Sequence, residues 1–355
     1  MRRPWWTALV LGLIVCASQA AAQTALPLRT VGRTVPGEAG FSLMQWPGVY
    51  FEGAFTGAEV TVGPVSGKAR FKVEIDGAPA GLLTSGDPDL RISGLSPAAH
   101  RLRVERIDEQ RDVVAGFGGA TVPGPENVLA PPPPRARQIE FIGDSFTTGF
   151  GLTAGRSFCT NGKIWATTDT SQTFAARLGR HYDADYQVIA YSAGGLVRNS
   201  PFRRTKPVVP QLYERTLFDD PTPAPRDPTW RPQLLVLSLG SNDFAPMDRR
   251  EAWKTPAQVE AALVPAGVAF VRKLQARYPG VKILLLDFDE APVVASNRLI
   301  MAELEKAGVS DVRHVSTRDR FAFSGCFQHL DAADNARITT QLQEVIDAWP
   351  GVWDR

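Results

Sequence analysis

Gly143, Asp144 and Ser145 follow a short apolar stretch, and a serine in this place could act as a nucleophile. The apolar stretch, residues 139–142, is expected to form a buried strand, after which the glycine turns the chain sharply. Open α/β folds place their sites at such carboxyl ends of strands. The chemistry would be acyl transfer through the Ser145 hydroxyl. The alternative is an ordinary strand-to-helix turn in which Ser145 caps a helix.

An asparagine follows a second expected strand, residues 234–239. Asn242 would therefore lie at the same edge of the sheet as Ser145. An amide donor that points at a developing oxyanion lowers the barrier to acyl transfer, so Asn242 is a candidate oxyanion donor. The alternative is an asparagine that only closes a turn.

A pair of glycines follows a third expected strand, residues 186–190. Glycine lets the backbone come close to a ligand, so an N–H in this turn could also bind an oxyanion. Gly194 and Gly195 are both candidates for this role. A turn that only requires positive φ angles explains the pair equally well.

The chain has four histidines, and one of them is a candidate general base. His100 falls in an expected β region, His181 at a helix end and His314 inside an expected strand, where a structural role is typical. His329 lies in a loop just before the last expected helix, where a base can reach a substrate. A histidine that takes the proton of Ser145 would complete a nucleophile–base pair.

Strands and helices alternate after residue 137, which predicts a parallel sheet covered by helices. Expected strands are 139–142, 186–190, 234–239, 282–286 and 312–315, and expected helices are 172–182, 256–278, 294–307 and 332–349. Pro265 and Gly267 predict a kink or break in the second of these helices. The segment 198–231 is rich in Pro, Arg and Asp with little periodicity, and a loop of this length could wall the site.

Residues before the parallel sheet are expected to be all β. Segment 69–77 alternates strictly and ends in an Asp-Gly turn pair, and segment 101–107 repeats the alternation. Turn signals recur at the spacing of a β-sandwich. The predicted organisation is a signal peptide at 1–22, a β-sandwich domain at 23–125, a stiff Pro-rich linker at 126–137 and an α/β domain at 138–355.

The N-terminus reads as a cleaved secretory signal, with Arg2 and Arg3 before an apolar run and then three alanines at 20–22. An uncleaved anchor is the lesser alternative. Without those two arginines the chain has 37 basic and 37 acidic residues, which gives no reason to expect binding to nucleic acid or an anionic membrane. We expect a secreted or periplasmic monomer.

Two cysteines remain after the expected cleavage, Cys159 and Cys326. In an oxidising compartment an isolated pair is more often bridged than free, so the pair is a candidate disulfide. The sequence does not test the geometry that a bridge requires, and both states stay open.

Taken in chain order, these motifs resemble the SGNH hydrolases, also called GDSL-type hydrolases. Within them the chain is most similar to carbohydrate esterase family 2, which includes acetyl xylan esterases, over essentially the whole mature chain. The resemblance implies a flavodoxin-like three-layer α/β hydrolase domain preceded by an all-β, jelly-roll-like sandwich. The segments that carry it are 46–49, 139–147, 186–199, 210–216, 230 and 239–244, with the Pro-rich linker.

The resemblance implies roles for the site residues. Ser145 matches the nucleophile and, through its N–H, one oxyanion donor; Gly195 and Asn242 match the other donors. His329 matches the base. The superfamily has an aspartate three residues before this histidine, and Cys326 stands there instead.

Family 2 esterases often hold the histidine through a backbone carbonyl, so a Ser–His dyad is expected. A bridge between Cys159 and Cys326 would then brace the loop that carries His329. Asp331 and Asp334 are nearby carboxylates, and we expect them to cap the last helix.

The implied reaction is removal of O-acetyl groups from a polysaccharide of the xylan or mannan type, with Trp230 and Asp243 as candidate residues of the substrate cleft. Acyl transfer through Ser145 needs no metal or organic cofactor, and no His/Asp cluster has the ligand spacing of a zinc deacetylase. The alternatives are an esterase for another acylated glycan or small molecule, and a carbohydrate-binding protein whose catalytic site has decayed.

Overall fold

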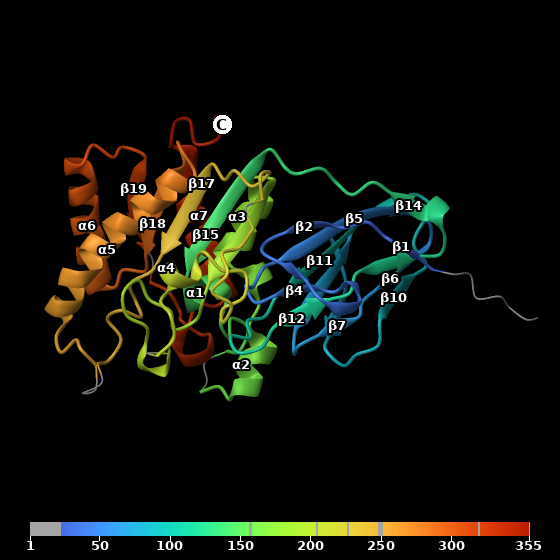
Figure 1. Ribbon diagram of the computed structural model, residues 1–355, viewed down its shortest axis with the longest axis horizontal. Coiled ribbons are helices and arrows are strands. Elements are labelled where there is room, and N and C mark those ends of the chain that lie inside the picture. Colours follow the sequence, from blue (N-terminus) through green and yellow to red (C-terminus); the bar gives the residue numbers. More distant parts are fainter. Residues whose placement is uncertain are drawn as a thin grey trace, which may run out of the picture.

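The computed structural model describes residues 23–155, 158–203, 205–225, 227–247, 251–318 and 320–354. Figure 1 shows two regions along the long axis, a β region in blue and cyan and an α/β region in green to red. The expected signal peptide at 1–22 lies outside the described residues. The domain boundaries stay a prediction.

The α/β region is built on one five-stranded sheet in the order β16-β15-β17-β18-β19, and every neighbouring pair is parallel. This is the flavodoxin-like order, with the first strand inside the sheet and the second at its edge. The predicted α/β fold class is confirmed. The strands are β15 Arg137–Gly143, β16 Ala184–Ala190, β17 Leu234–Ser238, β18 Lys282–Asp287 and β19 Val312–Ser316.

Helices cover the sheet, since every residue of β16 and β17 is buried, as in strands covered on both faces. Helix α3 packs against α7, and α5 packs against α6. The α-helices are α1 Ser145–Thr148, α2 Asn161–Thr167, α3 Phe174–His181, α4 Val209–Leu212, α5 Pro256–Arg277, α6 Ala291–Lys306 and α7 Ala332–Asp347. The 3₁₀ helices are η1 Glu38–Gly40, η2 Pro125–Asn127, η3 Thr170–Gln172, η4 Pro201–Arg203 and η5 Cys326–Gln328.

Helix α5 continues through Pro265, so the expectation of a break was wrong. A proline costs one helical hydrogen bond, but the helix is held by its packing on α6. Gly267 is part of that packing, because a Cβ atom there would overlap the side chain of Ile300 on α6. The glycine therefore marks a close helix–helix approach.

The β region consists of three antiparallel sheets, with orders β1-β13-β6-β10, β14-β5-β11-β8-β9 and β3-β4-β12-β7. The predicted alternation in β8 is confirmed, since Phe71, Val73 and Ile75 are buried and the residues between them are half-buried. The rings of Phe51 and Phe71 both contact Phe117 in the core. The strands are β1 Thr24–Ala25, β2 Arg29–Val31, β3 Val35–Pro36, β4 Ser42–Met44, β5 Tyr50–Thr56, β6 Glu59–Val62, β7 Val65–Ser66, β8 Arg70–Ile75, β9 Ala78–Thr84, β10 Leu90–Ser93, β11 Ala99–Arg106, β12 Ala115–Phe117, β13 Ala120–Val122 and β14 Val128–Leu129.

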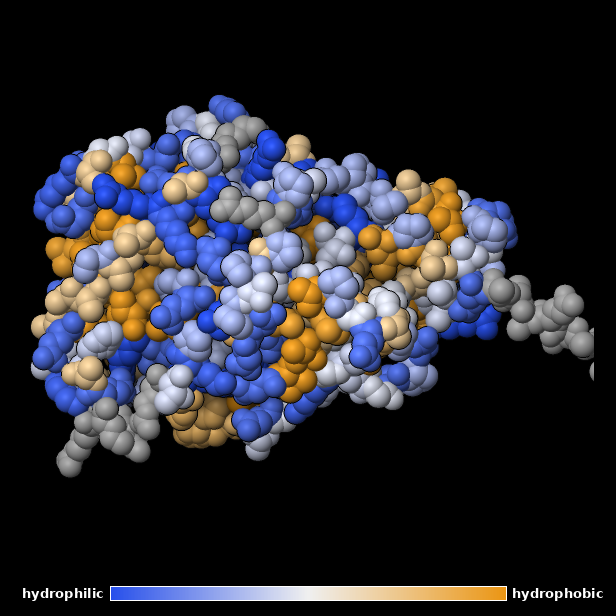
Figure 2. All heavy atoms as spheres, in the orientation of Figure 1, coloured by the Kyte–Doolittle hydropathy of each residue, from blue (hydrophilic) through white to orange (hydrophobic). Residues whose placement is uncertain are grey.

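Charged side chains join the two regions. The Arg135 guanidinium, in the predicted linker, donates to Glu52 of β5 at 2.8 Å and to Asp185 of β16 at 2.8 Å. The long loop 198–231 meets the β region as well, where the Trp46 indole donates to the Arg215 carbonyl at 2.9 Å. On the face shown in Figure 2, hydrophilic and hydrophobic residues are interspersed over both regions. Among the described residues, none of the helices has the length and apolar character needed to cross a membrane.

Candidate active site

Ser145 is the first residue of α1, directly after β15. Asp144 caps the helix, and its Oδ1 accepts from the Phe146 N–H at 3.1 Å. Gly143 is required before it, since a Cβ atom there would overlap Thr147. The capping function suggested for Ser145 thus falls to Asp144, which leaves the Ser145 hydroxyl for other contacts.

His329 contacts Ser145 as the sequence predicted, with 2.8 Å between the imidazole Nε2 and the Ser145 Oγ. Its other ring nitrogen, Nδ1, is 2.7 Å from the Cys326 carbonyl oxygen. A carbonyl oxygen can only accept, so Nδ1 carries the proton and Nε2 of the neutral ring accepts from the Ser145 hydroxyl. This is the tautomer that a general base requires.

The surroundings of His329 favour its neutral form. Burial lowers the pKa of the His329 imidazole, and the Cys326 carbonyl that accepts from the ring opposes this only in part. The rings of Phe146 and Phe150 lie against the imidazole, with centroids 5.3 Å and 4.6 Å away. The apolar contacts disfavour the charged imidazolium, so the ring is ready to accept a proton at neutral pH.

Cys326 stands three residues before His329, and it is joined to Cys159 by a disulfide with 1.99 Å between the sulfur atoms. The Cys326 side chain sits against Gly151, where any Cβ would overlap it, and the Cys326 N–H donates to the Gly151 carbonyl at 3.1 Å. Residues on both sides of the disulfide therefore fix the carbonyl that holds the histidine.

The turn that carries His329 is strained. Phe327 and Gln328 have φ angles of 50° and 61°, a region that costs energy for residues other than glycine. The expected capping by the two nearby carboxylates is present: Asp331 accepts from the N–H of Asp334 at 2.8 Å, and Asp334 accepts from the N–H of Asp331 at 3.3 Å. Asp334 also accepts from two N–H groups of the preceding loop. Both acids therefore serve the helix and the loop.

Asn242 lies beside the nucleophile, and its amide Nδ2 donates to Asp144 Oδ2 at 2.9 Å and to the Gly194 carbonyl at 3.1 Å. Burial raises the pKa of Asp144 to about 8, against the hydrogen bonds from Phe146 and Asn242. To donate to a substrate oxygen, the Asn242 amide would have to give up one of these two hydrogen bonds.

The N–H groups of Gly194 and Gly195 both donate hydrogen bonds within the protein. The Gly195 N–H donates to Asn199 Oδ1 at 3.0 Å, and the Gly194 N–H donates to the Tyr191 carbonyl at 2.9 Å. Neither N–H points to Ser145 with a free hydrogen, so an oxyanion role for Gly195 stays a prediction. By contrast, the Ser145 N–H opens a helix, where the first N–H groups have no helical acceptor.

A cavity of about 1080 Å³ opens in front of Ser145 and His329. The lining residues that sequence reasoning missed include Ser241, Glu290, Phe158 and Phe327. A signal was available for two of them, because Ser241 and Glu290 come three residues after the ends of strands β17 and β18, at the edge where Ser145 lies. Within the described ranges, three or more His, Cys, Asp or Glu side chains are nowhere grouped so that they could hold a metal ion.

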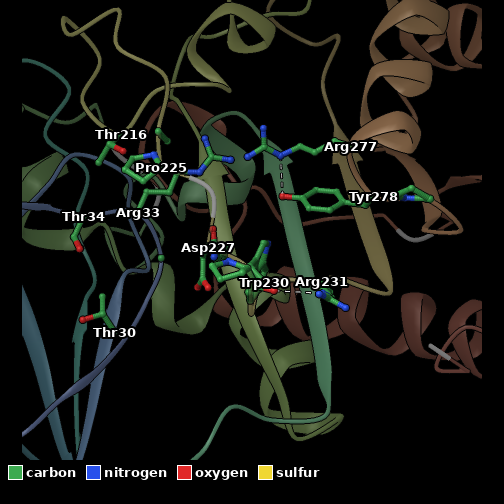
Figure 3. Close-up of a pocket in the computed structure, with 15 residues that line it drawn as sticks. Thr30, Arg33, Thr34, Thr216, Pro225, Asp227, Trp230, Arg231, Arg277 and Tyr278 are labelled. Carbon is green, nitrogen blue, oxygen red and sulfur yellow. Dashed lines mark hydrogen bonds between the residues drawn. The ribbon is translucent and has the colours of Figure 1, made fainter.

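Trp230 and Asp243 are not among the described residues that line this cavity, so their place in a substrate cleft stays a prediction. Trp230 lines a separate cavity of about 810 Å³ with Arg231 and Tyr278 (Figure 3). Its indole donates to the buried Glu140 at 2.9 Å, so the ring is held in the core. The 198–231 loop supplies walls of this second cavity rather than of the one at Ser145.

Asp243 is fully buried under the glycine turn. Its carboxylate accepts from the N–H groups of Leu196, Val197 and Arg198 at 2.8, 2.8 and 2.9 Å. Burial raises the pKa of Asp243 to about 6. The carboxylate therefore holds the backbone that follows Gly195 and is not available to a substrate.

The chain is similar to known proteins along its whole length. Residues 30–132 match the family "Carbohydrate esterase 2 N-terminal", and residues 141–343 match the "GDSL-like Lipase/Acylhydrolase family". An acetylxylan esterase / glucomannan deacetylase of Cellvibrio japonicus (strain Ueda107) is 31% identical, over 97% of this chain and 98% of the relative.

Solved structures agree. One is a carbohydrate esterase described as having divergent catalytic and non-catalytic binding functions in its active site, with a TM-score of 0.80 and 29% identity over 93% of this chain and 100% of the other. Another is a family 2 carbohydrate esterase with a carbohydrate-binding domain from Corynascus (Myceliophthora fergusii), with a TM-score of 0.72 and 28% identity over 91% of this chain and 100% of the other. The chain belongs to carbohydrate esterase family 2, within the GDSL-like lipase/acylhydrolase proteins, and is a carboxylic ester hydrolase.

Proposed function

We propose that this protein is a serine esterase that removes O-acetyl groups from a polysaccharide of the xylan or mannan type, with Ser145 and His329 as its catalytic dyad. The observation that carries the proposal is the 2.8 Å contact between His329 Nε2 and Ser145 Oγ at the floor of an open cavity. The names of the Cellvibrio japonicus relative support the acetylated glycan as substrate.

The reaction would proceed in two acyl-transfer steps. Ser145 Oγ attacks the acetyl carbonyl carbon while its proton passes to His329 Nε2, and that proton then goes to the departing sugar oxygen. His329 next takes a proton from water, the hydroxide attacks the acetyl–Ser145 ester, and the proton returns to Ser145 as acetate leaves. The oxyanion in each step would be bound by the Ser145 N–H and the amide of Asn242, with Gly195 as the predicted third donor.

The missing carboxylate would be replaced by the restraint on the Cys326 carbonyl. This carbonyl fixes the tautomer of His329, and the disulfide to Cys159 holds the strained turn that presents it. A carbonyl dipole stabilises the imidazolium less than a carboxylate would. The base is therefore expected to act through orientation and a dry environment more than through a charged partner.

The wider organisation follows the same proposal. A signal peptide at 1–22 would direct a monomeric enzyme out of the cytoplasm, and a β domain at 23–125 would be joined through a linker at 126–137 to a hydrolase domain at 138–355. The family matches at 30–132 and 141–343 support this division.

The proposal is tested by acetate release from acetylated xylan, acetylated glucomannan and an activated aryl acetate. Wild type should release acetate, and Ser145→Ala and His329→Ala should each lose at least about 10³-fold in kcat/KM, with unchanged circular dichroism spectra. No release by wild type from any of the three esters would contradict the proposal, and glycan binding that survives in Ser145→Ala would then favour a binding protein.

A further inference from the structure

Glu290 faces the same cavity as Ser145 but has no part in the mechanism above. It directly precedes α6 and comes three residues after the end of β18, and it lines the cavity. The Ser241 hydroxyl donates to Glu290 Oε1 at 2.5 Å. The side chain makes no capping hydrogen bond to α6, although the residue occupies the N-cap position. Helix capping therefore does not explain a carboxylate in this place.

Among the lining residues that the structure describes, none carries a positive charge that could balance Glu290. Asp144 and Glu290 are the acids among the described lining residues, and neither lysine nor arginine is among them. Asp144 is buried, and its two oxygens already accept from the Phe146 N–H and the Asn242 amide, whereas Glu290 is only half-buried. Burial also favours the neutral form of His329 by lowering its pKa. Of the two described carboxyl groups in the lining, Glu290 is thus the one that a substrate can reach.

The apolar walls of the cavity screen the charge of Glu290 only weakly, so it can act on a substrate over several ångströms. Phe146, Phe158, Phe323 and Phe327 line the cavity, and such apolar side chains screen charge less than water does. Burial also raises the pKa of the Glu290 carboxyl, which agrees with its poor solvation. A carboxylate in this setting gains from a hydroxyl donor and repels another anion.

We propose that Glu290 determines specificity for the leaving group: its carboxylate accepts a hydroxyl of an electrically neutral acylated sugar and excludes esters that carry a negative charge beside the acyl group. This inference rests on the proposed esterase function. The substrates it selects are acetylated neutral hexoses or pentoses, and the ones it disfavours are acetylated residues that carry a uronate carboxylate near the ester. No step of the dyad chemistry depends on it.

Two aryl acetates that differ in charge test the proposal: 4-acetoxybenzoate, an anion, and its neutral methyl ester. Their kcat/KM values are measured at about pH 7, where ordinary carboxyl groups are ionised, and each is divided by the rate of alkaline hydrolysis to remove intrinsic reactivity. The variants are Glu290→Gln, which keeps an acceptor for Ser241, and Glu303→Gln, an exposed position on the same helix whose carboxylate pairs with Lys306.

Wild type and Glu303→Gln should prefer the neutral ester by about tenfold or more, as expected for one poorly screened like charge. Glu290→Gln should reduce this preference to about threefold or less, mainly by improved hydrolysis of the anion, and should raise KM for an acetylated neutral glycan. Equal corrected rates in wild type, or an unchanged preference in Glu290→Gln, would overturn the inference. Failure of wild type to hydrolyse either ester would instead count against the proposed function.

Discussion

Two cavities adjoin the α/β region, and they use polar side chains in opposite ways. In front of Ser145, the hydroxyl and the imidazole of His329 face open space and bond to each other. In the cavity of Figure 3, Trp230 donates to Glu140 at 2.9 Å, and the hydroxyl of Tyr278 donates to the same carboxylate at 3.3 Å. The comparison teaches that polar residues near a cavity serve chemistry where their hydrogen bonds can be exchanged, and serve stability where the core already uses them.

The largest effect beyond the dyad is expected for Asn242→Ala at the first cavity. Loss of one amide donor to the oxyanion should reduce kcat by about 10²–10³-fold. KM for an aryl acetate should change little, because the donor acts mainly on the transition state. Steady-state kinetics on an activated aryl acetate checks this, and a loss below about threefold would show that Asn242 keeps its present bonds to Asp144 and Gly194.

A smaller loss is expected when the disulfide is removed by Cys159→Ser. The Cys326 carbonyl remains, but the strained turn loses a restraint, and slight misplacement of His329 should reduce kcat by about tenfold to a hundredfold. Cys159→Ser combined with Cys326→Asp places a carboxylate where the superfamily has one, and should restore part of kcat.

Two comparisons keep this prediction falsifiable. Thermal unfolding shows whether each variant is folded at the assay temperature, since the disulfide also adds stability. Full activity in folded Cys159→Ser would contradict a positioning role for the disulfide. If kcat falls in Cys159→Ser and does not recover in the aspartate variant, the disulfide is the restraint that positions His329, and a carboxylate at position 326 does not replace it.

The pH dependence of activity gives a third test at the first cavity. His329 is active as the neutral imidazole, and burial lowers its pKa, so activity should persist to lower pH than an ordinary histidine allows. The pKa obtained from the acid limb of the kcat/KM profile should therefore be lower than about 6.5, the usual histidine pKa. In Cys159→Ser, water that enters the loop should raise the pKa of His329 and so shift the acid limb to higher pH. A wild-type pKa at or above the usual histidine value would contradict the view that His329 acts in an apolar environment.

The smallest effect on activity is expected at the second cavity, for Trp230→Phe. The change removes one donor to the buried Glu140 and should cost about 1–3 kcal/mol of unfolding free energy. The values of kcat and KM for acetylated xylan should stay within about twofold of wild type, since Trp230 lies away from Ser145. Denaturant unfolding measures the change in unfolding free energy, and kinetics on acetylated xylan measure kcat and KM. A raised KM would support the predicted place of Trp230 in the substrate cleft.

Much of the fold was predictable because its signals are local. Apolar runs between turn residues marked all five parallel strands to within two residues of their ends, and the turns after them placed Ser145 and Asn242 at one edge. The break expected at Pro265 was wrong because packing on α6 is a long-range contact that no local pattern reports. Local signals thus predicted elements better than the contacts between them.

The site was predictable where a residue follows a strand and less so where a loop decides its position. Trp230 lines the second cavity because its loop runs to the β region, and nothing in the composition of the loop indicates that path. Its place in a substrate cleft stays a prediction. The Gly195 N–H was expected at the oxyanion, yet it bonds to Asn199, four residues later. Glu290 was missed although it follows a parallel strand, so strand ends should be searched for every polar residue, including those outside known motifs.

The most direct test of the central claim is to trap the acyl-enzyme. Wild type, Ser145→Ala and His329→Ala are mixed with an activated aryl acetate, quenched in acid within the first turnover and digested for mass spectrometry. The account predicts one acetyl group on Ser145 of the wild type, none at this position in Ser145→Ala, and strongly reduced labelling in His329→Ala. Release of acetate by wild type with no acetyl on Ser145, or with the acetyl on another residue, would contradict it.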